Sequence, residues 1–245
     1  MDRLTPTQRP VGGRLAQRQG WYDLLFLHWE VPVEALSALV PSSLEIDTFE
    51  GRAFVGLVPF TMRGVRLAGW PAVPGTANFH ETNVRTYVHR EGRDPGVWFF
   101  SLDAASRLAV TVARALWHLP YFYAAMSLDR RADGEIAYAT RRRDDGAHCT
   151  VAYTPKGAPR AATPGSLEHF LAERYLLYAN AGEGDLYRGQ VHHAPYPLEE
   201  AEVTAWSESL LARAGIDRPA GPPLAHYARG VEVEVFALER LSLGP

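Results

Sequence analysis

One segment, Phe79–Val88, carries the side chains best suited to chemistry. Alternate residues of a β-strand point to the same face, so Glu81, Asn83, Arg85 and Tyr87 would share one face of a strand here. An acid, an amide and a guanidinium flanked by aromatic rings are typical of a pocket that binds a small polar ligand. In such a pocket Glu81 could move a proton and the other three could bind the ligand. The same pattern also fits the solvated face of an exposed strand.

A second candidate cluster lies on a predicted helix and at its exit. Arg114 and His118 are four residues apart and would lie on one helical stripe. Tyr121 and Tyr123 follow on one face of the next predicted strand. Arg114 could bind a carboxylate through two hydrogen bonds, and His118 could act as a proton-transfer partner. The alternative is a solvated helix stripe with ordinary interfacial tyrosines.

Two further basic residues need separate interpretations. Arg174 comes near the end of a predicted helix, where it could contact a ligand or the last helix carbonyls. Lys156 is the only lysine among 25 lysine and arginine residues, and it lies in a segment rich in proline and glycine. A lysine that forms an imine needs burial or a neighbouring cation to lower its pKa. We therefore expect Lys156 in a surface turn without a catalytic role.

The histidines and glycines do not form a cofactor motif. His192 and His193 are adjacent and would point to opposite faces of a strand. The chain has no Cys/His framework for zinc, no G-x-G-x-x-G motif and no phosphate-binding loop. We expect no metal and no cofactor. Cys149, the single cysteine, lies in a predicted strand and fits a packed core position.

Composition narrows the range of partners. The chain is 47% hydrophobic and 22% charged, as in ordinary globular proteins, and its formal net charge of −3 argues against nucleic-acid binding. No run of about 18 apolar residues is present, so no membrane-spanning helix is expected. The polar N-terminus lacks the apolar stretch of a signal peptide. We expect a cytoplasmic protein whose partner is a small-molecule ligand, with no membrane association.

The candidate residues need a scaffold of many short strands. Residues 1–20 are expected to form a flexible N-terminal arm, and residues 21–245 one barrel-like domain. Roughly ten strands and a few short helices predict an α+β fold, with a large, mostly antiparallel sheet or barrel around an interior pocket. The order of elements does not alternate as in a Rossmann-type sheet. The expected helices are Val33–Val40, Ala104–Trp117 after an Asp103 N-cap, Ser166–Tyr175 and Trp206–Ala214.

Several longer motifs together resemble the YqjF-like family of uncharacterised bacterial proteins. The resemblance extends from about Trp21 to Leu241. It is carried by Leu25–Trp29, Val58–Phe60, Phe79–Val88, Phe99–Asp103, Leu119–Tyr121, Ser166–Tyr175 and His193-x-Pro195.

The YqjF-like family is similar in fold to acetoacetate decarboxylase, and this resemblance has three implications. The polar face of Phe79–Tyr87 would point into an interior pocket, where Glu81 would match the pocket glutamate of the decarboxylases. The protein could also be a homo-oligomer. The decarboxylases carry a Schiff-base lysine in the segment that here is Arg114–Tyr121, which contains no lysine. Because arginine is too basic to form an imine, we expect a different mechanism.

Two functions fit a small-molecule pocket, and a third interpretation, an interaction scaffold or oligomer subunit, would be supported by a large exposed apolar patch. One is a lyase- or isomerase-type enzyme that acts on an anionic carbonyl or carboxylate compound without a Schiff-base lysine. The alternative is a non-catalytic barrel that binds or senses a small ligand.

Overall fold

A single 13-stranded sheet dominates the computed structural model, which describes residues 1–182 and 185–242. The strand order is β13-β10-β9-β5-β6-β7-β8-β11-β12-β1-β3-β4-β2. The strands are β1 (Leu15–Val31), β2 (Glu45–Ile46), β3 (Ala53–Leu67), β4 (Phe79–Arg90), β5 (Arg93–Ala104), β6 (Tyr121–Arg130), β7 (Ile136–Arg142), β8 (His148–Arg160), β9 (Leu176–Asn180), β10 (Leu186–His192), β11 (Leu198–Glu208), β12 (Leu224–Phe236) and β13 (Glu239–Leu241). The helices are the 3-10 turn η1 (Thr5–Thr7), α1 (Val33–Ser37), α2 (Arg107–Trp117), α3 (Leu167–Ala172) and α4 (Leu210–Arg213).

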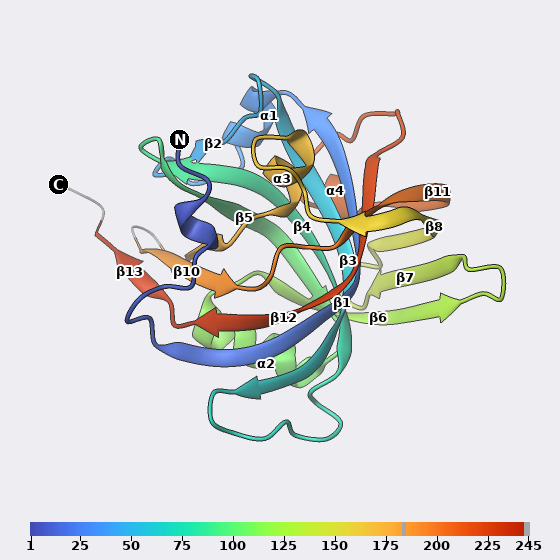
Figure 1. The fold of residues 1–245 in the computed structure, drawn as a ribbon, viewed down its shortest axis with the longest axis horizontal. Helices are drawn as coiled ribbons and strands as arrows, with labels where there is room; N and C mark the ends of the chain where they lie inside the picture. The colour runs from blue at the N-terminus through green and yellow to red at the C-terminus, as the bar shows by residue number, and fades with distance from the viewer. Residues whose placement is uncertain (183–184, 243–245) are drawn as a thin grey trace.

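Two additional strand pairings curl this sheet back on itself. β4 pairs with β5, and β10 pairs with β12, although these strands are distant in the order. Most pairings are antiparallel, while β5 runs parallel to both β6 and β9. The long strands β1, β3 and β4 cross the middle of the molecule, and α2 lies behind β1 in the view of Figure 1. The expected α+β fold with a large, mostly antiparallel sheet is confirmed.

The strands β1, β3 and β4 form a wall with a different environment on each face. Ten consecutive residues of β3, 53–62, are buried, so both faces of this strand are covered by other parts of the protein. On β4, Thr82 and Val84 face the strands β7 and β8; the Thr82 hydroxyl lies 2.7 Å from that of Thr140. Glu81 and Asn83 point to the other face. The alternation of a strand therefore separates the hydrophobic core from a polar site.

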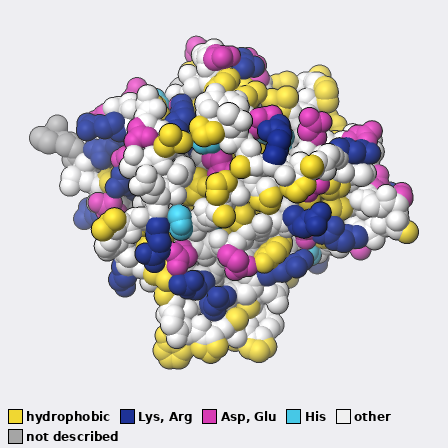
Figure 2. Space-filling view, viewed as in Figure 1, with side chains coloured by type: hydrophobic (Ala, Val, Ile, Leu, Met, Phe, Trp, Pro, Cys, Tyr) yellow, Lys and Arg dark blue, Asp and Glu magenta, His cyan; other side chains and the backbone are white. Residues whose placement is uncertain are grey.

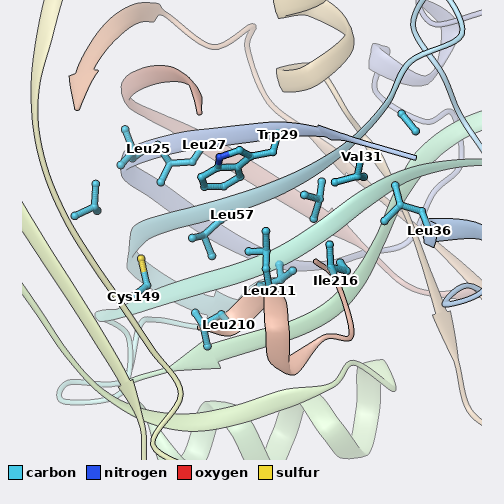
Figure 3. Close-up of a cluster of buried hydrophobic side chains, with 14 of the residues drawn as sticks. Leu25, Leu27, Trp29, Val31, Leu36, Leu57, Cys149, Leu210, Leu211 and Ile216 are labelled. Atoms are coloured by element: carbon cyan, nitrogen blue, oxygen red, sulfur yellow. The ribbon is translucent and has the colours of Figure 1, made fainter. Parts of the chain in front are cut away.

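The main hydrophobic core fills the side of this wall that faces β7, β8 and β11. Side chains from β1 and β3 meet Leu210 and Leu211 of α4, both fully buried (Figure 3). Cys149 of β8 is 1% exposed and lies in the same cluster, as expected for a packed cysteine. This part of the fold is packed solid, which leaves the opposite face of the wall for a site.

Several boundaries differ from those expected because strands extend further than the helical patterns suggested. The α2 helix begins at Arg107, and its N-cap is Ser106, whose Oγ accepts a hydrogen bond from the amide of Ala109. Asp103 instead lies in β5 and binds Arg142. Similarly, β11 continues to Glu208, so α4 begins at Leu210 instead of Trp206.

The N-terminal segment lies against the sheet over part of its length. Residues from Leu15 onward form the start of β1 and pair with β12, although a flexible arm was expected there. Further upstream, Arg3 forms an ion pair with the buried Asp47. No helix in the described part of the chain has the length and apolar character needed to cross a membrane.

The surface mixes both signs of charge with a few exposed apolar groups. Figure 2 shows arginines and acids interspersed over one face, and apolar side chains at its lower tip. That tip is the loop between β3 and β4, where Trp70 is 70% exposed and Val73 is 61% exposed.

Candidate active site

An interior cavity of about 190 Å³ lies on the polar face of β4. Side chains of β1, β3, β4, β5, β6, β9, β10, β12 and α2 line it. Most of the lining is apolar and includes Leu24, Val58, Phe60, Met62, Phe79, Val112, Ala113, Trp117, Val191 and Val235. The ionisable and amide groups that β4 contributes are Glu81, Asn83 and Arg85. The structure thus brings together three of the side chains singled out on this strand.

Glu81 is a buried carboxyl group with a single neighbouring donor. It is 2% exposed, and the Tyr121 hydroxyl donates a hydrogen bond to its Oε2 at 2.9 Å. Burial raises the pKa of Glu81 to about 8, although the hydrogen bond from Tyr121 lowers it and the charge of Asp103 raises it slightly further. Near neutral pH this group can therefore both donate and accept a proton, as a general acid–base residue must.

Arg85 is a buried cation without an acidic partner. It is 8% exposed, and no carboxylate within the described residues forms an ion pair with it. Its Nη2 donates to the carbonyl oxygen of Leu171 at 3.1 Å, while its buried Nε has no partner among those residues. A buried charge is costly unless it is paired. An anion that enters the cavity would supply the missing partner.

Asn83 lies between the two charged residues along β4. It is 5% exposed, and its Oδ1 is buried without a hydrogen-bond partner among the described residues. Buried polar atoms normally have partners. Three neighbouring side chains of one strand therefore present unused hydrogen-bonding or charged capacity to the same cavity.

A buried layer behind the cavity holds Arg85 in place. The Tyr87 hydroxyl donates to the Leu171 carbonyl at 2.6 Å and lies 2.6 Å from Nε2 of His28. Gly56 leaves room for the His28 ring, because a Cβ there would lie 3.1 Å from it. Burial holds the pKa of His28 well below its usual value. Tyr87, expected as a ligand contact, is thus not part of the cavity lining and supports Arg85 from behind.

The structure does not bring three residues of the helix cluster into the cavity. Arg114 is exposed, and its Nε donates to the backbone oxygen of Tyr121 at 2.6 Å. His118 ends α2 in a left-handed conformation, and its ring lies 5.1 Å from that of Tyr187. Tyr123 stacks under Arg107 at 4.7 Å. The reason is the αL cap, which turns the chain so that Tyr121 alone reaches Glu81.

Arg174 also lies away from the cavity. Its Nη1 binds Asp47 at 2.8 Å, and its Nε donates to the Phe170 carbonyl at 2.7 Å. This is the helix-end contact that the sequence allowed as an alternative to ligand binding.

Lys156 is remote from the candidate site. It lies in β8, where a surface turn was expected, but its side chain is 53% exposed and binds Glu202 at 2.9 Å. The cavity lining contains no lysine.

The apolar part of the site was not predicted from the sequence. Val112, Ala113 and Trp117 of α2 line the cavity, together with Trp21 and Tyr196. Apolar residues of the segment 104–117 recur at helical spacing, and this pattern could have identified the first two, because an apolar helix face packs against another part of the protein. No group of three or more His, Cys, Asp and Glu residues in the described ranges is placed to hold a metal ion.

Comparison with known proteins now places the chain in a family. Residues 18–232 match the family DUF2071, described as an uncharacterized conserved protein. The uncharacterized protein YqjF of Bacillus subtilis (strain 168) is 42% identical over 225 residues, which cover 92% of each chain. The chain belongs to this family. The predicted resemblance to the YqjF-like proteins is confirmed.

Solved structures similar to this DUF2071 protein share its fold at low sequence identity. Acetoacetate decarboxylase from Legionella pneumophila aligns with a TM-score of 0.68 and 10% identity, over 97% of this chain and 92% of that one. The enduracididine biosynthesis enzyme MppR, in complex with the condensation product of pyruvate and imidazole 4-carboxaldehyde, aligns with a TM-score of 0.68 and 12% identity, over 94% and 90%. The acetoacetate-decarboxylase-like fold is confirmed.

Proposed function

We propose that this protein is an enzyme that binds a small carboxylate with an adjacent carbonyl group and transfers a proton at the neighbouring carbon. The observation that carries the proposal is the unpaired, buried guanidinium of Arg85 in the same cavity as the carboxyl group of Glu81. Arg85 would bind the substrate carboxylate, and Glu81 would move the proton.

The proposed step needs no covalent intermediate. The Glu81 carboxylate takes a proton from the carbon next to the carbonyl, and the C–H electron pair moves into a C=C bond as the carbonyl becomes an enolate. The side chains of Asn83 and Arg85 can donate hydrogen bonds to the developing charge on oxygen. Return of the proton from Glu81 to the same carbon regenerates the oxo acid with its hydrogen exchanged, whereas delivery of the proton to the enolate oxygen completes isomerisation to the enol.

Several observations support a mechanism without an imine. The one lysine is exposed and bound to Glu202. Arginine does not form imines, because its guanidinium group is too basic to lose a proton. The likeness in fold to MppR, which was crystallised with a product of pyruvate, agrees with an oxo-acid ligand at the level of fold analogy.

The test is hydrogen–deuterium exchange at the C3 position of 2-oxobutanoate, followed by NMR in D2O. We expect the wild-type protein to accelerate exchange. Glu81→Gln should abolish the acceleration and retain binding, whereas Arg85→Ala should weaken binding. Lys156→Ala is the matched control and should change neither, and borohydride should trap no adduct. Exchange that is unaffected by Glu81→Gln would contradict the proposal.

A non-catalytic binding barrel is the second candidate, and the mostly apolar wall of the cavity favours it. An ion pair between Glu81 and Arg85 would support that candidate further, but no such pair is found within the described residues. Tight binding of an oxo acid without any accelerated exchange would select the binding function.

A further inference from the structure

Among the described residues, Asn83 and Arg85 are the cavity-lining side chains that bury a polar atom without a partner, and both belong to β4. On β1, Trp21 donates to Gln19 at 2.8 Å and Gln19 donates to Gln17 at 2.8 Å, so these polar side chains bind one another. The elements β3, β10, β12 and α2 contribute apolar side chains to the lining. A ligand with polar groups at both ends would leave one end without hydrogen bonds, at a cost.

The register of β4 orders the polar groups along the cavity. Four residues separate Arg85 from Glu81, which corresponds to about 13 Å of extended strand. The Arg85 end is backed by the Leu171 carbonyl and Tyr87. Beyond Glu81 the wall continues with Phe79, whose strand partner is Met62. A carboxylate held by Arg85 would therefore direct the rest of the ligand toward apolar side chains.

The α2 helix covers the apolar part of the cavity with apolar side chains. Val112, Ala113 and Trp117 line the cavity from this helix. Ala115 comes two residues after Ala113, which places it on nearly the opposite side of the helix, and it is exposed. The same helix thus offers a matched pair of alanines for substitution: Ala113, which lines the cavity, and Ala115, which does not.

The volume of the cavity exceeds what a short acid can fill. An apolar cavity of about 150 Å³ is large enough to hold benzene, and this cavity measures about 190 Å³. Pyruvate would occupy the polar wall and leave the apolar walls without contacts, which forfeits dispersion attraction.

We propose that the substrate is a 2-oxo acid with a bulky hydrophobic tail, either a ring or an alkyl chain of about five to six carbons, which packs beneath α2. The assignment of the carboxylate to Arg85 rests on the proposed function. The assignment of the tail rests separately on the apolar lining and on the size of the cavity.

The test is calorimetric titration of the wild-type protein with pyruvate, 2-oxobutanoate, 2-oxohexanoate, 2-oxooctanoate and 4-phenyl-2-oxobutanoate. Burial of each methylene should raise affinity about fourfold. We expect 2-oxooctanoate and 4-phenyl-2-oxobutanoate to bind at least about 100-fold more tightly than pyruvate. Equal affinity across the series would overturn the proposed tail and leave the proton-transfer function intact.

Two further measurements separate the tail from the carboxylate. Ala113→Phe should weaken binding of 2-oxooctanoate at least about tenfold and change pyruvate binding less than about threefold, because the new ring occupies only the tail region. Ala115→Phe, on the solvent side of the same helix, should change neither. If 2-octanone binds as tightly as 2-oxooctanoate, the tail assignment stands and the role of Arg85 fails. If no acid binds at all, both proposals fail.

Discussion

At the scale of single residues, the site contains an acid and a cation that do not neutralise each other. Glu81 hydrogen-bonds to Tyr121, and Arg85 hydrogen-bonds to a backbone carbonyl. Each side chain is buried against different neighbours. The pKa of Glu81 therefore stays raised, and the charge of Arg85 stays unpaired. This separation leaves both groups available to a ligand.

The proton-transfer role of Glu81 predicts a specific pH profile. With a pKa of about 8, about one tenth of Glu81 is in the basic, deprotonated form at pH 7. Below pH 7 this fraction falls about tenfold for each unit by which the pH is lowered. Deuterium exchange at saturating 2-oxobutanoate should therefore increase about tenfold from pH 6 to 7 and level off above pH 8 to 9. A rate that is flat across this range would contradict the role as a base.

The buried hydroxyl of Tyr87 gives a second prediction at this scale. Tyr87→Phe removes a donor to the Leu171 carbonyl and a partner of His28. We expect the free energy of unfolding, measured by urea denaturation, to fall by about 1–3 kcal/mol. Tyr178→Phe removes a hydroxyl that binds the Asp94 carbonyl far from the site and is the matched control for ligand affinity. Only Tyr87→Phe should also weaken oxo-acid binding.

At the scale of elements, the site depends on how β5 meets its neighbours. β5 pairs with β4, β6 and β9, so it joins the strand that carries Glu81 to the strand that carries Tyr121. A buried ion pair reinforces the junction: Arg142 of β7 binds Asp103 of β5 through two hydrogen bonds, of 2.7 and 3.0 Å. Both side chains are almost fully buried.

Removal of one partner of this ion pair should be costly. Arg142→Ala leaves the Asp103 carboxylate buried without its counter-ion, and loss of one partner of a buried pair costs about 3–5 kcal/mol. Thermal or urea unfolding measures the loss. The neighbouring Arg141 is exposed, and Arg141→Ala should cost less than about 0.5 kcal/mol. Equal losses in the two variants would contradict the prediction that the buried ion pair stabilises the junction.

The parallel pairing of β5 with β9 depends on Gly96. A Cβ at this position would lie 2.8 Å from the backbone oxygen of Leu176, so Gly96→Ala must push the strands apart. We expect a loss of about 1–3 kcal/mol in stability. Gly221→Ala, where a Cβ meets nothing within 4 Å, should be nearly neutral. A Gly96→Ala protein as stable as the wild type would show that β9 can shift freely.

At the scale of the whole molecule, the curled sheet divides the interior in two. One side of the wall of β1, β3 and β4 is filled by the main core, and the other encloses the cavity. A protein interior is normally packed to high density. The cavity and its buried polar groups therefore lower the stability of the fold, and such a loss of stability is typical of functional sites.

Burial of Glu81 should make global stability depend on pH. Its pKa is raised from 4.5 to about 8 on folding, so between these values the unfolded chain releases a proton that the folded chain keeps. The contribution of Glu81 to the free energy of unfolding should therefore be greatest below about pH 4.5. This contribution should be lost as the pH rises to about 8. The loss between pH 5 and 8 should be on the order of 3 kcal/mol.

Urea denaturation of wild type and Glu81→Gln at several pH values measures this contribution. The difference between the two proteins should change with pH in that window, because glutamine does not titrate. Glu202→Gln alters an exposed carboxyl and should leave the pH dependence as in the wild type. A constant difference between wild type and Glu81→Gln would mean that Glu81 ionises normally in the folded protein.

The sequence by itself determined the strand that carries the site and the face on which its polar groups lie. Strand alternation is a local property, so Glu81, Asn83 and Arg85 could be grouped from their spacing alone. The motifs also predicted the family and, through it, the fold. Composition showed that the chain has one lysine, and the resemblance to the decarboxylases implied that this lysine lies outside the segment where an imine would form.

Only the tertiary structure decided which distant residues join that strand. Tyr121 reaches Glu81 from 40 residues away, while Arg114, His118 and Tyr123, its neighbours in sequence, do not line the cavity. The left-handed turn at His118 and the parallel pairing of β5 with β6 set this arrangement. The burial that raises the pKa of Glu81 comes from walls contributed by nine separate elements. Such long-range packing leaves no periodic signal in the chain, because it depends on how the sheet closes.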